Sequence, residues 1–166
     1  KKQHLDIVLS GRANNGARDA GFDAIRFEHV ALPEIDMDSI DLTIQFLGKS
    51  IHLPFLVSSM TGGPEAARQI NRNLAIACET LQLPLAVGSQ RISLEGEHKG
   101  GLDGELRQLA PTIPILANIG AAQLNTGFGI EEARRAVEMI EADALILHLN
   151  PLQEAVQPEG DRNWAG

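Results

Sequence analysis

Four side chains that can bind ligands or move protons follow one apolar run near the end of the chain. The run ALIL at 144–147 leads into the stretch HLNPLQEAVQPEGDRN at 148–163, which carries His148, Asn150, Gln153 and Glu154. A histidine can exchange a proton near neutral pH. A carboxylate is the hard oxygen ligand that Mg²⁺ uses together with substrate phosphates. Because an ordinary connecting loop needs none of these groups, the cluster indicates a binding or catalytic site.

Three earlier stretches also place polar or small residues directly after an apolar run: SSMTGG at 58–63, GSQR at 88–91 and ANIG at 117–120. Glycines allow the backbone to approach a flat ring or a phosphate closely. Arg91 offers a planar fork that suits a phosphate. Asn118 stands between apolar residues and needs partners if it is buried, which the edge of a flavin ring would supply. Taken singly, these stretches are also typical of ordinary turns, and a surface arginine is the simpler interpretation of Arg91.

Several known motifs are missing from the sequence. We find no zinc-ligand spacing, no nucleophile elbow and no Walker loop. The segment MTGGPEAA does not fit the G-x-G-x-x-G fingerprint of dinucleotide-binding folds.

Strand and helix patterns alternate from residue 53 onward. Short apolar runs predict strands at 53–60, 83–90, 113–120 and 143–150. Helical spacing predicts helices at 61–81 and 130–142, and another that ends near 110–111. Such alternation at short intervals predicts βα units and a parallel sheet.

The parallel sheet could belong to a doubly wound fold or to a (β/α)₈ TIM barrel. Every predicted strand ends in polar or glycine residues, and barrel enzymes build their active site at that carboxyl-terminal rim. The sequence therefore favours a TIM barrel, of which the chain covers an N-terminal segment and roughly the first four βα units.

Two parts are expected. Residues 1–52 should form a helix, a loop and a hairpin that pack on the barrel, with the hairpin in DLTIQFLGKSIHLP at 41–54. Residues 53–166 should form the first half of the barrel. No helix is predicted after the fourth strand, and half a barrel leaves two open edges, so we expect the chain to be part of something larger. The exposed apolar surface of a half-barrel favours a homo-oligomer.

Composition narrows the functional class. The chain has 166 residues, a net charge of −8 and one cysteine. The negative charge argues against general nucleic-acid binding. No apolar run approaches the roughly 20 residues that a membrane helix needs, and a single cysteine fits a reducing compartment. We therefore expect a cytoplasmic protein without membrane or nucleic-acid partners.

The motifs MTGG, VGSQR, ANIGAAQL and HLNPLQEAVQPEGDRN, in this order and spacing, resemble type 2 isopentenyl-diphosphate isomerases. The resemblance runs over nearly the whole chain, and its most specific part is the H-x-N-x-x-Q-E string followed by PEGDR. It implies an FMN-dependent (β/α)₈ barrel that interconverts isopentenyl and dimethylallyl diphosphate, with Mg²⁺ and with NAD(P)H as the reductant.

The resemblance also implies roles for individual residues. The flavin would be bound by Met60, Thr61, Gly62, Ser89 and Asn118. The diphosphate substrate would be bound by Lys1, Ser89, Gln90, Arg91, Asn150 and Gln153. Glu154 would coordinate Mg²⁺. The expected catalytic residues are Gln153, which would lie over the allylic part of the substrate, and His148, which would line the same pocket.

The implied reaction transfers a proton at the allyl unit and leaves the redox state unchanged, with FMN acting in its reduced form. A glutamine is a poor general acid, so Gln153 would position the substrate or relay a proton. Two alternatives remain open at this point. One is an FMN-dependent TIM-barrel oxidoreductase of the 2-hydroxy-acid oxidase or IMP dehydrogenase kind. The other is a non-catalytic module that binds flavin or phosphate.

Overall fold

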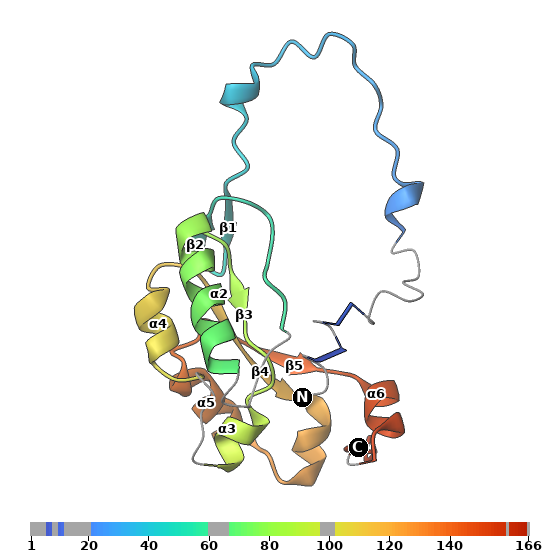
Figure 1. Cartoon of the computed structure of the whole chain (residues 1–166), viewed down its shortest axis with the longest axis vertical. Helices are drawn as coiled ribbons and strands as arrows, with labels where there is room; N and C mark the ends of the chain where they lie inside the picture. Colours follow the sequence, from blue (N-terminus) through green and yellow to red (C-terminus); the bar gives the residue numbers. More distant parts are fainter. Residues whose placement is uncertain are drawn as a thin grey trace. The chain divides into compact units, whose positions relative to one another are not determined.

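The computed structural model describes residues 6–7, 10–11, 21–59, 67–96, 102–158 and 160–165. The chain forms two compact units, residues 1–41 and 42–166. The first contains two short 3₁₀ helices, η2 (Phe22–Ala24) and η3 (Met37–Ser39), neither of which has a buried residue. The second contains the sheet and its helices (Figure 1). The expected division into an N-terminal part at 1–52 and the first half of a barrel at 53–166 stays a prediction.

Three parallel strands follow one another in chain order through the sheet: β3 (Leu85–Ala86), β4 (Ile115–Gly120) and β5 (Ala144–His148). Val57 adds a single parallel bridge to Leu85 on the other side of β3. The parallel α/β sheet predicted from the sequence is confirmed. A closed barrel is not seen in the part of the chain that the structure describes.

The main core lies between this sheet and three helices, α2 (Ala67–Leu81), α4 (Glu105–Leu109) and α5 (Ile130–Met139). Alternate residues of β4, namely Ile115, Ala117 and Ile119, are buried in this core. Because side chains alternate along a strand, Leu116 and Asn118 lie on the opposite face. Within the described residues, no helix has the length and apolar character needed to cross a membrane.

The helices at 67–81 and 130–139, and a helix that ends at Leu109, agree with the predicted ones. The acidic first turn of α5 contains Glu132, whose carboxylate accepts a hydrogen bond from the backbone N–H of Gly129 at 2.8 Å. This bond, together with a bond from the backbone N–H of Glu132 itself, holds the pKa of Glu132 below its usual value.

Two predicted elements differ from the structure. The strand expected at 53–60 is reduced to the bridge at Val57, because Pro54 has no N–H and the N–H of Phe55 bonds to the carbonyl of Leu53 at 2.8 Å. The expectation of no helix after the fourth strand is wrong. Residues Pro151–Val156 form the short helix α6, in which proline occupies the first turn, where its fixed φ is tolerated.

The hairpin predicted around Leu47 and Gly48 is confirmed. Strands β1 (Ile44–Phe46) and β2 (Lys49–Ile51) pair antiparallel. The two turn residues have φ values of 50° and 76°, as a two-residue turn that matches the twist of the strands requires.

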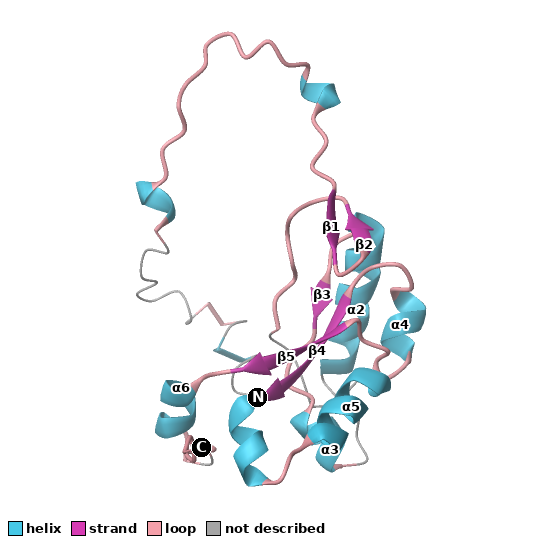
Figure 2. Cartoon of the chain, turned by 180° about the vertical axis from the view of Figure 1, so that it is seen from behind, coloured by secondary structure: helices cyan, strands magenta, loops and turns pink. Residues whose placement is uncertain are grey.

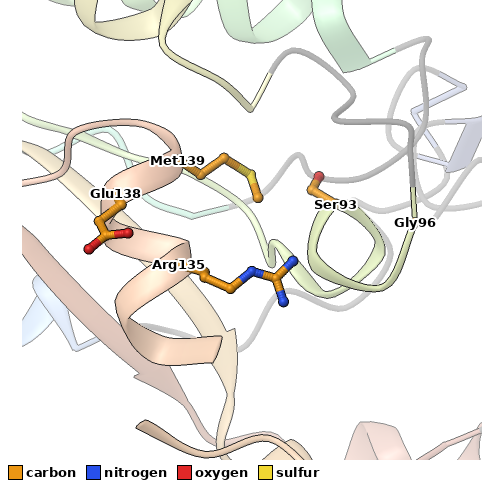
Figure 3. A pocket seen from close by; sticks show the side chains of 5 residues that line it. All are labelled: Ser93, Gly96, Arg135, Glu138 and Met139. Carbon is orange, nitrogen blue, oxygen red and sulfur yellow. The ribbon is translucent and has the colours of Figure 1, made fainter. Parts of the chain in front are cut away.

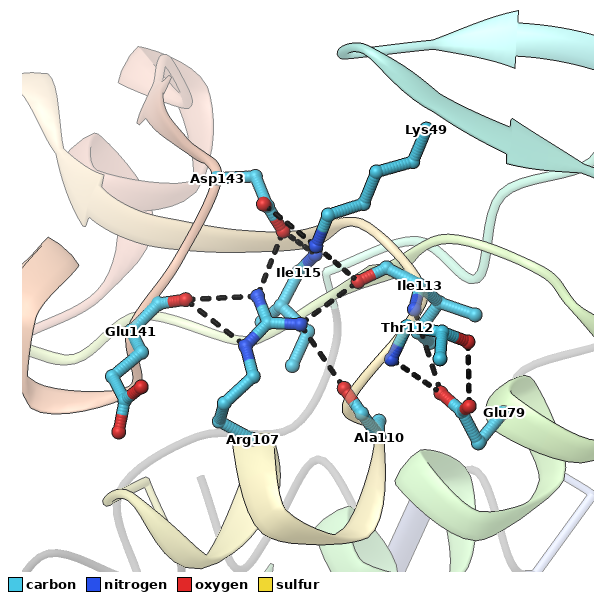
Figure 4. Close-up of polar contacts among 9 residues, drawn as sticks. All are labelled: Lys49, Glu79, Arg107, Ala110, Thr112, Ile113, Ile115, Glu141 and Asp143. Atoms are coloured by element: carbon cyan, nitrogen blue, oxygen red, sulfur yellow. Dashed lines mark hydrogen bonds and ion pairs between the residues drawn. The ribbon is translucent and has the colours of Figure 1, made fainter.

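A polar network joins this hairpin to the amino ends of β4 and β5 (Figure 4). Asp143 pairs with Lys49 at 2.8 Å and with Arg107 at 2.7 Å, and it also accepts the backbone N–H of Ile115 at 2.8 Å. Arg107 additionally donates to the carbonyls of three residues: Ala110, Ile113 and Glu141. Burial raises the pKa of Asp143, but these hydrogen bonds outweigh it and hold the pKa below its usual value.

We expect Asp143→Asn to lower the free energy of unfolding by about 2–3 kcal/mol at pH 7, because two partly buried cations lose their counter-charge. A carboxyl whose pKa is lower in the folded state stabilises above its unfolded pKa of about 3.9 and loses that contribution as pH falls through the folded pKa. The wild type should therefore lose more stability below pH ~4 than the variant does.

Urea unfolding at several pH values measures both effects. Glu131→Gln is the matched control, because Glu131 is a carboxylate with 70% side-chain exposure on α5 and should change stability by less than about 0.5 kcal/mol. Equal acid sensitivity of Asp143→Asn and the wild type would contradict the account.

Cys78 should be inert in the folded protein. It lies on α2 with 2% exposure, and burial raises its thiol pKa to about 11, so almost no reactive thiolate exists at pH 8. We expect a maleimide to label Cys78 in urea but not in native buffer, as mapped by peptide mass spectrometry. Rapid native labelling would show that this part of the core opens.

Candidate functional site

The carboxyl ends of β3, β4 and β5 lie next to one another. In the register of the sheet, Gly120 at the end of β4 pairs with His148 at the end of β5, and Gln90 follows β3. The short helix α6 begins three residues beyond His148 (Figure 2). Because parallel strands all end at one edge, polar residues far apart in the sequence are brought together there.

The buried side chain of Gln90 connects the end of β3 with β4 and α5. Its side chain is 0% exposed. Its amide oxygen accepts the backbone N–H of Asn118 at 3.0 Å, and its amide nitrogen donates to the carbonyl of Ala136 in α5 at 2.9 Å. Its own N–H donates to the carbonyl of Asn118 at 2.9 Å. The side chain is thus committed to protein backbone groups, while the direct substrate contact predicted for Gln90 stays a prediction.

Asn118 is 2% exposed, and its side-chain amide has no hydrogen bond to any residue that the structure describes. Ser59 is similar. Its hydroxyl is buried and lacks a partner within the same described residues. Buried polar groups of native proteins are nearly always bonded. The hydroxyl of Ser59 therefore fits a ligand with donors and acceptors on its edge.

Asn150, Gln153 and Glu154 form a cluster at the start of α6. The side-chain amide of Asn150 donates to Glu154 Oε1 at 3.1 Å and to Gln153 Oε1 at 3.3 Å. Residue spacing of three and four along a helical turn makes this contact possible. The amide of Asn150 thereby fixes the orientation of the Glu154 carboxylate.

Asp161 connects this cluster with the end of β3. Its backbone N–H donates to Glu154 Oε2 at 2.8 Å, and its carboxylate pairs with Arg91 Nη1 at 3.0 Å. The chain can return this close to α6 because residue 160 is glycine, where any Cβ would overlap the backbone of Glu154. Asp161 belongs to the PEGDR string, but nothing in the sequence pattern predicted a role for it.

The last described residues are also fixed to the end of β4. The side chain of Asn125, in the 3₁₀ helix η4 (Ala121–Thr126), donates to the carbonyls of Asn163 and Ala165 at 3.1 and 3.2 Å. The segment 160–165 therefore contacts groups that follow β3, β4 and β5 in turn. No pattern in the sequence predicted that this segment connects the groups that follow the three strands.

The remaining predicted residues are placed as follows. Ser89 accepts the backbone N–H of Arg91 at 3.4 Å. His148 is exposed, and strand alternation puts it on the face of the sheet that also carries Asn118. Four predicted residues lie outside the described part of the chain: Lys1, Met60, Thr61 and Gly62.

A cavity of about 360 Å³ lies elsewhere, between the short helix α3 (Arg91–Glu95) and α5 (Figure 3). It is lined by Ser93, Gly96, Arg135, Glu138 and Met139. None of the predicted site residues lines it, so it is not the site that the strand ends indicate.

The chemistry available at the strand ends is the binding of an anion together with a divalent cation. Arg91 keeps 37% side-chain exposure and has donors that Asp161 does not use. Each oxygen of Glu154 accepts one hydrogen bond and retains capacity to coordinate a metal. Among the described residues, no group of three His, Cys, Asp or Glu side chains is placed to hold a metal ion.

Comparison with known proteins finds relatives that share one name. The chain is 55% identical to the isopentenyl-diphosphate delta-isomerase of Xanthobacter autotrophicus and 57% identical to that of Pseudescherichia vulneris, in both cases over 166 residues. Identity to the enzyme of Vibrio parahaemolyticus is 50%. The resemblance to isopentenyl-diphosphate isomerases is confirmed. No family model matches the chain.

The match to the isomerases covers all of this chain but only part of each relative. The chain spans about half the length of the relatives it matches, 48% for the Xanthobacter and Pseudescherichia proteins and 49% for the Vibrio protein. The aligned region includes every element of the 42–166 unit.

We expect Gln90→Leu to lower the free energy of unfolding by about 2–3 kcal/mol, because it leaves the buried N–H of Asn118 without its partner. Gln69→Leu is the matched control, since Gln69 is exposed on α2 and its side-chain amide donates to the side chain of Asn73 on the same helix. Urea unfolding compares the two. Equal, small effects would show that the bonds of Gln90 do not hold the strand ends.

Proposed function

We propose that this chain is part of an isopentenyl-diphosphate delta-isomerase that interconverts isopentenyl and dimethylallyl diphosphate by allylic proton transfer with reduced FMN and Mg²⁺. The observation that carries the proposal is the connected chain Arg91–Asp161–Glu154 at the carboxyl ends of the strands. It sits in a sequence more than half identical to proteins of that name.

The proposed fold of the whole protein is a (β/α)₈ barrel. In support, Val57 and strands β3, β4 and β5 follow one another in chain order, all parallel. A doubly wound sheet reverses its strand order at the ligand crevice, whereas a barrel does not. Helices cover one face of the sheet, which is the arrangement of the outer ring of a barrel.

The diphosphate and metal would be held by opposite charges. Arg91 would donate to the diphosphate, and Lys1, Ser89, Gln90 and Asn150 are proposed to assist. Glu154 would coordinate Mg²⁺ and so place the cation against the same diphosphate. Binding the charged end of the substrate in this way fixes the position of its reacting carbons, which is how remote binding energy serves a chemical step.

The residues present fit a flavin. The buried hydroxyl of Ser59 has no partner in the described part of the chain, and Asn118 is 2% exposed. Met60, Thr61, Gly62 and Ser89 are proposed to line the same ring. When bound and reduced, FMN supplies an electron-rich ring that can give and take the proton. NAD(P)H is the proposed reductant.

Gln153 is proposed to hold the allyl unit and His148 to line the pocket beside it. Gln153 is held by Asn150, whose amide donates to its side-chain oxygen at 3.3 Å. The neutral amide of Gln153 is far from the pKa range of an effective general acid, so its contribution is orientation of the substrate or relay of a proton. A cytoplasmic location and self-association stay predictions.

We expect Glu154→Gln to raise the Mg²⁺ concentration that gives half-maximal isomerase activity by about 10–100-fold, because the metal loses its anionic ligand. Isomerisation of isopentenyl diphosphate by the FMN-loaded, reduced protein is the assay. The exposed Glu131→Gln is the control and should leave the Mg²⁺ dependence unchanged.

The same assay separates the proposal from its alternatives. An isomerase turns over many times for each equivalent of NAD(P)H consumed, because the redox state of the substrate does not change. Consumption of one reductant or oxidant per turnover would indicate an oxidoreductase. Binding of FMN and diphosphate without turnover would indicate a module without activity.

A further inference from the structure

Asp161 lies between the two groups that the proposed function assigns to the two charged ends of one site. Its carboxylate bonds to the guanidinium of Arg91 at 3.0 Å. Its backbone N–H bonds to the carboxylate of Glu154 at 2.8 Å. The Asp161 side chain is 22% exposed, which leaves the ion pair only partly screened by water.

We propose that Asp161 is a positioning residue that fixes the diphosphate-binding Arg91 relative to the metal-binding Glu154. The inference rests on the proposed function for the identity of the ligand, and on the two contacts for its geometry. Because one residue holds both partners, the spacing between the cationic and the anionic group is set by protein bonds before any ligand binds.

The guanidinium of Arg91 has room for both an internal and an external partner. Asp161 uses Nη1, and the second nearby carboxylate, that of Glu95, is 3.9 Å from Nε. A guanidinium has five N–H donors in a rigid fork, so an ion pair on one side aims the remaining donors at a fixed place. A diphosphate held by these donors and a cation held by Glu154 would be connected through Asp161.

Glu95 provides a matched control. It lies one helical turn from Arg91, has 55% side-chain exposure and makes no contact with Glu154 among the described residues. Glu95→Gln removes one negative charge near Arg91, as Asp161→Asn does, but it leaves the connection to Glu154 intact. An effect specific to Asp161 therefore reports positioning and not general charge.

The experiment compares Asp161→Asn with Glu95→Gln in the FMN-loaded full-length protein. For Asp161→Asn we expect KM for isopentenyl diphosphate to rise about tenfold while kcat changes less than about threefold, because orientation of the anion-binding fork is lost and the chemistry is not. Glu95→Gln should leave both constants unchanged. The flavin absorbance spectrum should be the same in all three proteins.

A double-mutant cycle with Arg91→Met tests whether Asp161 acts through Arg91. In the Arg91→Met background, Asp161→Asn should add no further increase in KM. Additive effects of the two changes would overturn the proposal, as would a KM for Asp161→Asn that is no higher than for Glu95→Gln. Asp161→Glu, which keeps the charge, serves as a second variant if Asp161→Asn does not fold, and it should raise KM less than tenfold.

A binding measurement separates failure of this inference from failure of the proposed function. Calorimetry with inorganic pyrophosphate and Mg²⁺ needs no turnover. If the wild type binds pyrophosphate more tightly than Asp161→Asn but does not isomerise the substrate, the positioning role stands and the isomerase function fails. If Asp161→Asn and Glu95→Gln bind pyrophosphate as tightly as the wild type, the positioning role fails whatever the activity.

Discussion

The side chain of Gln90 holds the carboxyl ends of β3 and β4 in one arrangement, and the polar cluster depends on that arrangement. Its amide oxygen and nitrogen bond to backbone groups of Asn118 and of α5 in a fully buried setting. A bond made inside the core is costly to lose, since a buried N–H left alone carries its full desolvation penalty. The residues on either side of Gln90, Ser89 and Arg91, take their positions from this anchor.

The amino and carboxyl ends of the strands differ in how their charged side chains are paired. At the amino ends, Asp143 has its charge balanced by Lys49 and Arg107, and its hydrogen bonds keep it ionised. At the carboxyl ends, Arg91 and Glu154 are held in place and still retain capacity for further partners. In barrel proteins the amino-terminal face of the strands typically serves stability, and the carboxyl-terminal face holds the active site.

Much of the fold could be predicted from the sequence, because local sequence patterns specify the individual helices, strands and turns. The periodicity of α5, the apolar run of β4 and the Leu47–Gly48 turn each specify their element within a few residues. The strand predicted at 53–60 was too long. Its apolar composition is typical of a strand, but Pro54 lacks the N–H that a strand residue donates. Helix α6 was missed because the same residues that begin a helix, Asn150 and Pro151, are also common in loops.

The long-range contacts could not be predicted in the same way. The bond from Asp161 to Glu154 depends on a close return of the chain that only the folded structure defines, and the bonds from Asn125 to residues 163 and 165 span about forty positions. No periodicity encodes such pairs. Motif order predicted which residues form the candidate site, and their chemical roles stay predictions.

The most direct test is a crystal structure of the full-length protein with FMN, Mg²⁺ and isopentenyl diphosphate. The account predicts Mg²⁺ at about 2.1 Å from a Glu154 oxygen, the diphosphate on Arg91 while Asp161 still holds that arginine, and the flavin against Asn118. A diphosphate bound away from the carboxyl ends of β3–β5, or a metal without Glu154 as a ligand, would contradict it.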